Sequence, residues 1–292
     1  MIYHIANSYL NVEVDSKGAE LQSIRANDGT EYLWQGNPKY WKDRALTIFP
    51  YIARLTEDSY YLDGERYQMN IHGLAPYFDF ACVENNETSL VLEMVDSPDT
   101  LIQYPRKFAF RVTYQLEQNL LSVLYTVENH DDKTIYFGVG GHPGFNVPLV
   151  AGRKFEDYRL RFSEEHIPVR VGFSDTCYLN GQDMPYLLEN STTIPLCHNL
   201  FNQDAVVFRS TATTVTLECE NDPHAVTVSF PQMPYLGIWH MPKTDAPYVC
   251  IEPWSSLPSR ENIIEDFSQQ ESLISLPAQE TYQNTWTMLF CW

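Results

Sequence analysis

Glu252 is the residue whose surroundings most favour acid–base chemistry. It follows the apolar run YVCI at 248–251 and precedes Pro253 and Trp254. Apolar surroundings disfavour an ionised carboxylate, so we expect the pKa of Glu252 to be raised. A carboxyl group with a raised pKa can act as a general acid or base near neutral pH. The alternative is a glutamate at the end of a strand, with its side chain in water.

Two histidines are further candidates for proton transfer. His142 lies in GVGGHPGFN at 138–146, where glycines allow a close backbone approach or an unusual φ and Pro143 fixes the chain. The alternative for this segment is a turn that carries a structural histidine. His72 lies in MNIHGLAPYF at 69–78. A single histidine in such a segment is more often a hydrogen-bonded structural residue than a catalyst.

Motifs for other kinds of catalysis are absent. The sequence contains no G-x-S-x-G, no H-E-x-x-H or H-x-H pair, and no phosphate-binding or dinucleotide-binding glycine motif. Its six cysteines form no C-x-x-C pair and are too sparse for a disulfide scaffold. No signal-peptide pattern is evident. We therefore expect chemistry without a metal or cofactor, in a cytoplasmic protein with reduced thiols.

The composition excludes several kinds of partner. The 292 residues carry a formal net charge of −19, and an acidic surface repels nucleic acid and anionic lipid. The uncharged stretch at 135–152 contains Gly, Pro, Asn and His, which argues against a membrane span. A phosphorylated substrate would need a local cluster of positive charge. The sequence does not fix the oligomeric state.

The elements that must position these candidates are strands. Alternating or β-branched runs predict many of them, and two close runs read as an antiparallel hairpin. Asp63-Gly64, between YYL and ERYQM, is a second hairpin signal because both residues accept a positive φ. The predicted strands include 108–116, 120–128, 158–162, 214–219 and 225–230.

Helical signals are few and short. Only 38–43 and 262–267 could form about one turn each, and no linker or internal repeat divides the chain. Many short strands without alternating helices indicate an all-β fold, a large sandwich of antiparallel sheets. We expect residues 1–292 to form a single domain of this kind.

Six short motifs, in a fixed order, resemble the aldose 1-epimerase (galactose mutarotase-like) superfamily, and its bacterial LacX-like branch in particular. The resemblance covers nearly the whole chain. It implies a β-sandwich of the supersandwich type, with an open cleft for a free monosaccharide whose α and β anomers the family interconverts. The motifs are GAELQSI, GTEYLWQGNPKYW, LTIFPYIARL, NIHGLA, GGHPGFN and CIEPW.

The resemblance also implies roles for individual residues. His142 matches the histidine that protonates the ring oxygen, and Glu252 matches the glutamate that takes the proton from the anomeric hydroxyl. His72 matches a second histidine, which hydrogen-bonds the sugar near its reactive end. Arg54, in YIARL, matches an arginine that binds sugar hydroxyls, and Asp204, in FNQDAVVF, matches a substrate-binding aspartate.

Trp239 and Trp254 are candidates for lining the cleft, with core packing as the alternative. The residues around His142 and after Glu252 differ from those of the galactose mutarotases proper, so a preference for galactose does not follow. Arg44 and Arg54 lie near the expected cleft, but they do not form a convincing cluster for a phosphate.

Three functions therefore remain open at this point. The first is mutarotation of a free aldohexose, and the second is mutarotation of a hexose 6-phosphate. The third is a non-catalytic carbohydrate-binding protein on the same fold, because a fold does not determine a function. The presence of both His142 and Glu252 favours an enzyme.

Overall fold

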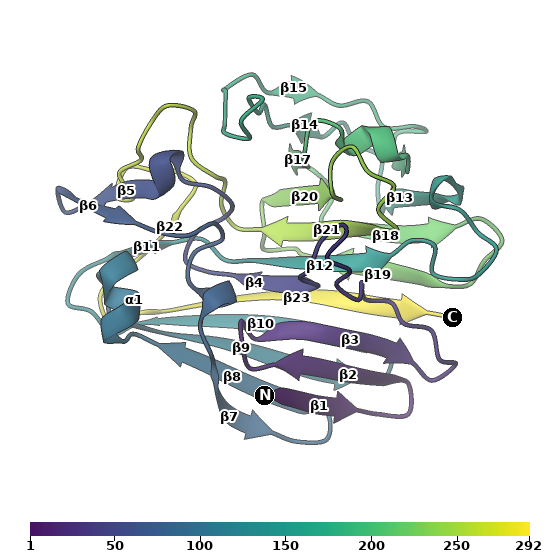
Figure 1. Ribbon diagram of the computed structural model, residues 1–292, viewed down its shortest axis with the longest axis horizontal. Coiled ribbons are helices and arrows are strands. Elements are labelled where there is room, and N and C mark those ends of the chain that lie inside the picture. The colour runs from purple at the N-terminus through teal and green to yellow at the C-terminus, as the bar shows by residue number, and fades with distance from the viewer.

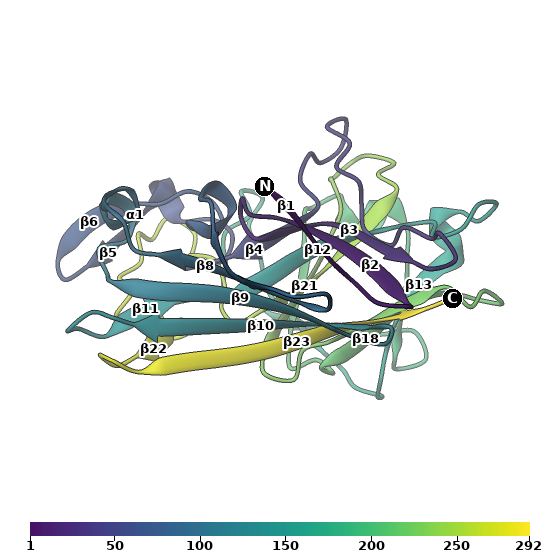
Figure 2. The same cartoon turned by 90° about the horizontal axis from the view of Figure 1, so that it is seen from below.

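Antiparallel β-sheets make up most of the structure, a computed structural model that describes residues 1–292. Two large sheets pack face to face, and three smaller sheets surround them (Figures 1 and 2). The predicted all-β sandwich is thus confirmed. One cluster of 65 buried hydrophobic residues includes side chains from both large sheets, among them Phe110 and Ile251.

The larger sheet has nine strands and contains most of the strands predicted from alternation. Its central hairpin pairs Leu120 with Glu117 and Asn129 with Phe108, as the sequence predicted. In sheet order the strands are β16 (Thr193–Pro195), β13 (Tyr158–Phe162), β18 (Thr214–Cys219), β19 (Ala225–Ser229), β23 (Thr281–Cys291), β10 (Leu120–Asn129), β9 (Phe108–Glu117), β8 (Ser89–Val95) and β7 (Ala81–Asn85).

The second large sheet has seven strands, and it carries the two catalytic candidates on adjacent strands. Figure 1 shows its strands in succession across the upper half of the molecule. In sheet order they are β15 (Met184–Pro185), β14 (Val169–Arg170), β17 (Val206–Arg209), β20 (Tyr235–Trp239), β21 (Tyr248–Trp254), β12 (Gly140–Asn146) and β4 (Ala45–Ile48).

The smaller sheets comprise one three-stranded sheet and two two-stranded sheets, of which only one is a hairpin. The Asp63-Gly64 hairpin is confirmed, with φ of 54° and 83° at the two turn residues. The three-stranded sheet is β1 (Ile2–Ala6), β2 (Leu10–Asp15) and β3 (Glu20–Ala26), and the pairs are β5 (Ser59–Leu62) with β6 (Glu65–Gln68) and β11 (Ile135–Phe137) with β22 (Ile274–Leu276).

Both short helices predicted from the sequence are absent. Residues 38–40 form a turn, and Tyr40 and Trp41 pack with other aromatic side chains instead of continuing a helix. At 262–267 the backbone pairs with β5. The Phe267 N–H donates to the carbonyl of Tyr61, and the Tyr61 N–H donates to the carbonyl of Glu265. These bonds replace the helical ones.

The helix that does form was not predicted. It is α1 (Pro98–Gln103), which begins with Pro98 after Ser97, whose hydroxyl accepts a hydrogen bond from the Thr100 N–H. The four 3₁₀ segments are η1 (Thr56–Asp58), η2 (Ala75–Tyr77), η3 (Phe155–Asp157) and η4 (His198–Phe201). No helix has both the length and the apolar character that crossing a bilayer requires.

The glycine-rich segment around His142 is a strand, not a turn. Its glycines serve a close approach: a Cβ on Gly141 would lie 2.5 Å from the Trp286 ring, which rises from the opposite sheet. Tyr125, also from that sheet, donates its hydroxyl hydrogen to the carbonyl of Gly140 at 3.1 Å. The distance of β12 from the opposite sheet is therefore set by the absence of a side chain at Gly141 and by the contacts with Trp286 and Tyr125.

We expect Gly141→Ala to lower the free energy of unfolding by about 1–3 kcal/mol, because the added methyl overpacks the contact with Trp286. Equilibrium unfolding in urea measures this. In a Trp286→Phe background the smaller ring leaves room for the methyl group, so Gly141→Ala should lower the free energy of unfolding by less. Equal costs in both backgrounds would contradict the packing argument.

Candidate active site

Pairing between β12 and β21 sets His142 beside Glu252. Gly140 lies opposite Trp254 and Gly144 lies opposite Cys250, so His142 falls midway, across from Glu252. Residues directly opposite each other on paired antiparallel strands point to the same face of the sheet. The result is a distance of 3.2 Å between His142 Nε2 and Glu252 Oε2.

Both members of this pair are deeply buried. Only 7% of the surface of His142 and 1% of that of Glu252 is exposed. Burial lowers the pKa of His142 well below its usual range, and the nearby His72 lowers it further. Burial raises the pKa of Glu252 well above its usual range, and the charge of Asp204 raises it further. The raised pKa expected for Glu252 is thus confirmed.

These opposite pKa shifts define the proton content of the pair. With one proton the pair is either neutral imidazole beside a carboxylic acid or imidazolium beside a carboxylate, and both shifts favour the first form. His142 Nδ1 and Glu252 Oε2 lack hydrogen-bond partners within the chain, although both atoms are buried. Buried polar atoms without partners are costly, so these two are ready to bind a polar ligand.

The pair lies in a cavity of about 310 Å³. All seven residues singled out from the sequence line this cavity, although they come from six separate segments of the chain. They are Arg54, His72, His142, Asp204, Trp239, Glu252 and Trp254.

Aromatic rings enclose His142. The Trp41 ring lies against it at a centroid distance of 4.8 Å and an angle of 32°, and Trp239 meets it edge-on at 5.6 Å. Trp41 lines the cavity but was not among the predicted site residues. Its aromatic side chain in the motif GNPKYW was the available signal. These rings exclude water from the imidazole and offer apolar faces to the C–H groups of a sugar.

His72 is held in an unusual backbone conformation. Its φ is 63°, which is rare for a residue other than glycine, and its Nδ1 accepts a hydrogen bond from the Ala53 N–H at 3.3 Å. Burial lowers the pKa of His72 to about 4, so the ring is neutral at physiological pH. With Nδ1 as an acceptor, the ring hydrogen is on Nε2, which can donate to a ligand.

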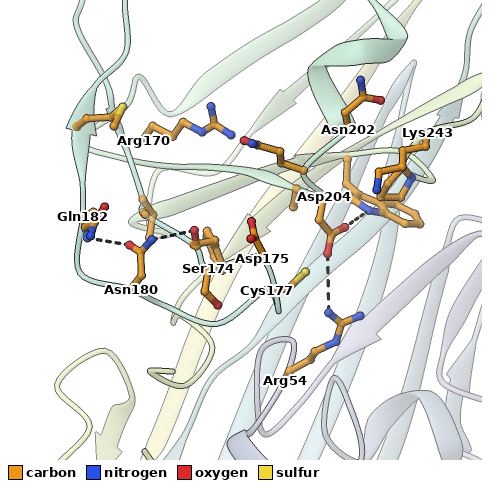
Figure 3. Close-up of a pocket in the computed structure, with 18 of the residues that line it drawn as sticks. Arg54, Arg170, Ser174, Asp175, Cys177, Asn180, Gln182, Asn202, Asp204 and Lys243 are labelled. Carbon is orange, nitrogen blue, oxygen red and sulfur yellow. Dashed lines mark hydrogen bonds and ion pairs between the residues drawn. The ribbon is translucent and has the colours of Figure 1, made fainter. Parts of the chain in front are cut away.

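Arg54 and Asp204 form the polar wall of the cavity (Figure 3). The Trp239 indole N–H donates to Asp204 Oδ1 at 2.6 Å, and Arg54 NH1 lies 3.8 Å from Asp204 Oδ2. Asp204 has a φ of 77°. The three side chains hold one another in place, and both charged groups retain free hydrogen-bonding positions for sugar hydroxyls.

Arg44 was expected near the cleft, but it lies outside it. Its guanidinium donates to Gln35 Oε1 at 2.9 Å and lines neither the 310 Å³ cavity nor the adjoining space. The loop that contains Gln35 and the β3 strand hold it on the outside of the site. Arg54 is therefore the only arginine of the inner cavity.

Three buried side chains could hold a metal ion. One ligand atom from each of His142, Cys250 and Glu252 lies within 4.8 Å of the others, and such nitrogen, sulfur and oxygen donors suit a zinc-like cation. Two of the three are the proton-sharing pair. Metal binding and proton transfer at this position are therefore mutually exclusive.

The proton pair makes stability depend on pH. In the unfolded chain Glu and His titrate near 4.5 and 6.5, so above pH 6.5 the unfolded chain holds no proton here, whereas the raised pKa of Glu252 lets the folded chain keep its proton to a higher pH than the unfolded chain does. The contribution of the pair to stability is therefore lost, by up to about 1.4 kcal/mol per pH unit, as the pH rises above 6.5.

Glu252→Gln removes this dependence, because the variant has no shared proton to lose. We expect its free energy of unfolding to exceed that of the wild type by a margin that widens with pH above 6.5. Urea unfolding at several pH values measures the margin. A constant margin would show that the folded pair does not retain its proton.

Comparison with known proteins identifies the family of the chain. The family described as aldose 1-epimerase matches residues 1–287. The chain is 34% identical over 287 residues to protein LacX (plasmid) of Lactococcus lactis subsp. lactis, which covers 94% of this chain and 96% of that protein.

Two solved structures share the fold at similar identity. A galactose mutarotase related enzyme from Lactobacillus acidophilus has a TM-score of 0.94 at 32% identity, covering 99% of this chain and 97% of the other. A galactose mutarotase-like protein from Lactobacillus casei has a TM-score of 0.94 at 30% identity, covering 99% and 100%. By sequence and by fold, the chain belongs to the aldose 1-epimerase family.

Proposed function

We propose that this protein interconverts the α and β anomers of a free aldohexose by acid–base ring opening. The observation that supports the proposal most directly is the buried contact of 3.2 Å between His142 Nε2 and Glu252 Oε2. A sugar ring opens when its ring oxygen gains a proton and its anomeric hydroxyl loses one. Both oxygens are bonded to C1, so two proton-handling atoms this close together can serve both.

The active form of the pair is imidazolium beside carboxylate. Glu252 takes the proton of the anomeric hydroxyl while His142 donates a proton to the ring oxygen, and the C1–O bond of the ring breaks. The products are an open-chain aldehyde, a neutral imidazole and a carboxylic acid. Rotation about C1–C2 exposes the other face of the aldehyde, and the reverse transfers close the ring.

This cycle requires no net exchange of protons with solvent. The pair begins and ends with one proton, and the open-chain stage differs only in which atoms carry it. Burial lowers the pKa of His142 and raises that of Glu252, which favours the neutral form of the pair, and the ion-pair form is reached from it by moving one proton across a contact of 3.2 Å. A water-excluding site therefore suits this reaction.

The remaining cavity residues bind and orient the sugar. His72 donates from Nε2 near the reactive end, and Arg54 and Asp204 bind hydroxyls on the far side of the ring. Trp41, Trp239 and Trp254 provide the apolar walls. Orientation matters here because a displacement of the reacting atoms by an ångström costs much of the rate.

Replacement of either member of the pair tests the proposal. We expect Glu252→Gln and His142→Asn each to lower kcat by about 10²- to 10⁴-fold, the usual contribution of one general acid or base. Optical rotation of fresh α-D-glucose or α-D-galactose against time, corrected for the spontaneous rate, measures it. Glu65→Gln, on an exposed strand position, is the matched control and should be fully active. Wild-type rates in either pair variant would refute these roles.

The pH profile provides a second test. The pair stays singly protonated below pH 6.5, because burial lowers the pKa of His142, and above pH 4.5, because burial raises that of Glu252. We expect kcat/KM to be flat through neutrality and across pH 6.5, with one loss at lower pH and another at higher pH. An inflection at 6.5 would mean that His142 titrates as an ordinary surface histidine.

The two other functions make different predictions. A hexose-6-phosphate mutarotase would prefer the phosphorylated sugar, but the inner cavity contains a single arginine, already beside Asp204. A non-catalytic binding protein would bind sugars in calorimetry without accelerating mutarotation. The buried proton pair favours the enzyme, because pure binding gains nothing from its desolvation cost.

A further inference from the structure

Two histidines that do not line the cavity form a hydrogen-bonded pair beside it. His240 directly follows Trp239 at the end of β20, and His198 begins η4, the short segment that leads to Asp204. His198 Nδ1 lies 3.2 Å from His240 Nε2. His240 is fully buried, and the proposed reaction uses neither ring.

The contacts of His240 determine the direction of this hydrogen bond. His240 Nδ1 lies 2.8 Å from the carbonyl oxygen of Met241, which can only accept, so the ring hydrogen is on Nδ1. Burial lowers the pKa of His240 to about 4, so the ring is neutral and its Nε2 is an acceptor. His198 therefore donates from Nδ1 to His240 Nε2.

Aromatic rings hold the two imidazoles in this arrangement. Phe155 stacks on His198 at a centroid distance of 4.1 Å and an angle of 21°, and Phe201 lies against His240 at 4.2 Å. An apolar side chain at position 240 would avoid the cost of burying a polar ring. A satisfied hydrogen bond in such surroundings favours one relative position of the two segments that it joins.

The same two segments meet again at the cavity wall. The Asp204 N–H donates to the carbonyl of Phe201, the last residue of η4, at 3.0 Å. Asp204 Oδ1 accepts the indole N–H of Trp239 at 2.6 Å. The φ of 77° at Asp204 is costly for a residue other than glycine, and it persists only where the surroundings hold it.

The end of β20 is held independently of the histidine pair. Trp239 pairs with Cys250 in the sheet, the Met241 N–H donates to the Tyr248 hydroxyl at 3.1 Å, and the Thr244 hydroxyl donates to the Met241 carbonyl at 2.7 Å. Loss of the bond between the histidines would therefore release the segment 198–204 and leave β20 in place.

We infer that His198 and His240 are positioning residues for sugar binding, whose hydrogen bond holds the segment 198–204 against β20 and so fixes the Asp204 carboxylate in the cavity. Neither ring contacts the sugar. The inference rests on the proposed function, in which Asp204 binds a sugar hydroxyl. Loss of the hydrogen bond weakens sugar binding and leaves the proton transfers unchanged.

Two substitutions at His198 separate its hydrogen bond from its bulk. The amide nitrogen of asparagine takes the place of Nδ1, so His198→Asn keeps a donor for His240, whereas His198→Leu removes it. In polarimetry on glucose and galactose we expect His198→Leu to raise KM about fivefold, the effect of losing one hydrogen bond, with kcat within about twofold of the wild-type value. His198→Asn should keep the wild-type KM. Equal KM values in the two variants would overturn the inference.

A double-mutant cycle tests whether the effect passes through Asp204. Asp204→Ala should itself raise KM, and adding His198→Leu should then change KM no further, because the carboxylate that the histidines position is gone. A rise in KM by the same factor in both backgrounds would indicate a merely structural role and would overturn the inference. An unchanged KM in Asp204→Ala would overturn it as well, since the pair would have no sugar contact to position.

The indole N–H of Trp239 reports on Asp204 in the absence of sugar. Its signal in ¹H–¹⁵N spectra is identified by its loss in Trp239→Phe. Because the hydrogen bond to Asp204 shifts the indole proton downfield, we expect an upfield shift in His198→Leu and none in His198→Asn. This result is independent of whether Glu252→Gln abolishes mutarotation, which tests the proposed function. An unmoved signal in His198→Leu would overturn the inference and leave the proposed function intact.

Discussion

The contact between Gly141 and Trp286 is the constraint on which the site depends. Because β12 has no side chain at this point, it can lie directly on the indole of the opposite sheet. This depth brings His142, one residue further along the strand, to the floor of a cavity. Pairing with β21 then places Glu252 beside it. A bulkier residue at 141 would lift the strand and move the imidazole relative to both the carboxyl and the surrounding tryptophans.

The same packing supplies the electrostatic character of the site. Burial shifts the pKa of His142 down and that of Glu252 up, which leaves one proton for two groups. The chain as a whole carries a net charge of −19, yet the pair itself is neutral overall. A neutral, desolvated acid–base pair is suited to a neutral sugar, whose reaction moves protons without creating net charge.

Much of the fold and the site could be predicted from the sequence, because alternation reveals strands and local motifs reveal unusual residues. The hairpin of β9 and β10 is an example. The strand β12 could not be predicted, since its glycines and proline are typical of turns. The side chains that require glycine there lie elsewhere in the chain: Trp254 against Gly140, Trp286 against Gly141 and Trp41 against Gly144. The contact of 3.2 Å between His142 and Glu252 depends on the register between β12 and β21. The place of Trp41 beside His142 depends on tertiary packing. The prediction that Arg44 lies near the cleft was wrong for the same reason, because its contact with Gln35 is a tertiary one.

The site divides between rigid and replaceable parts of the chain. His142 and Glu252 lie on paired strands inside a sheet, whereas Phe173 and Cys177, which also line the cavity, come from the loop between β14 and β15. Substitutions, insertions and deletions accumulate more readily in such loops than in core strands. Descendants of this chain could therefore acquire new sugar preferences through changes in one surface loop, while inheriting the reaction unaltered.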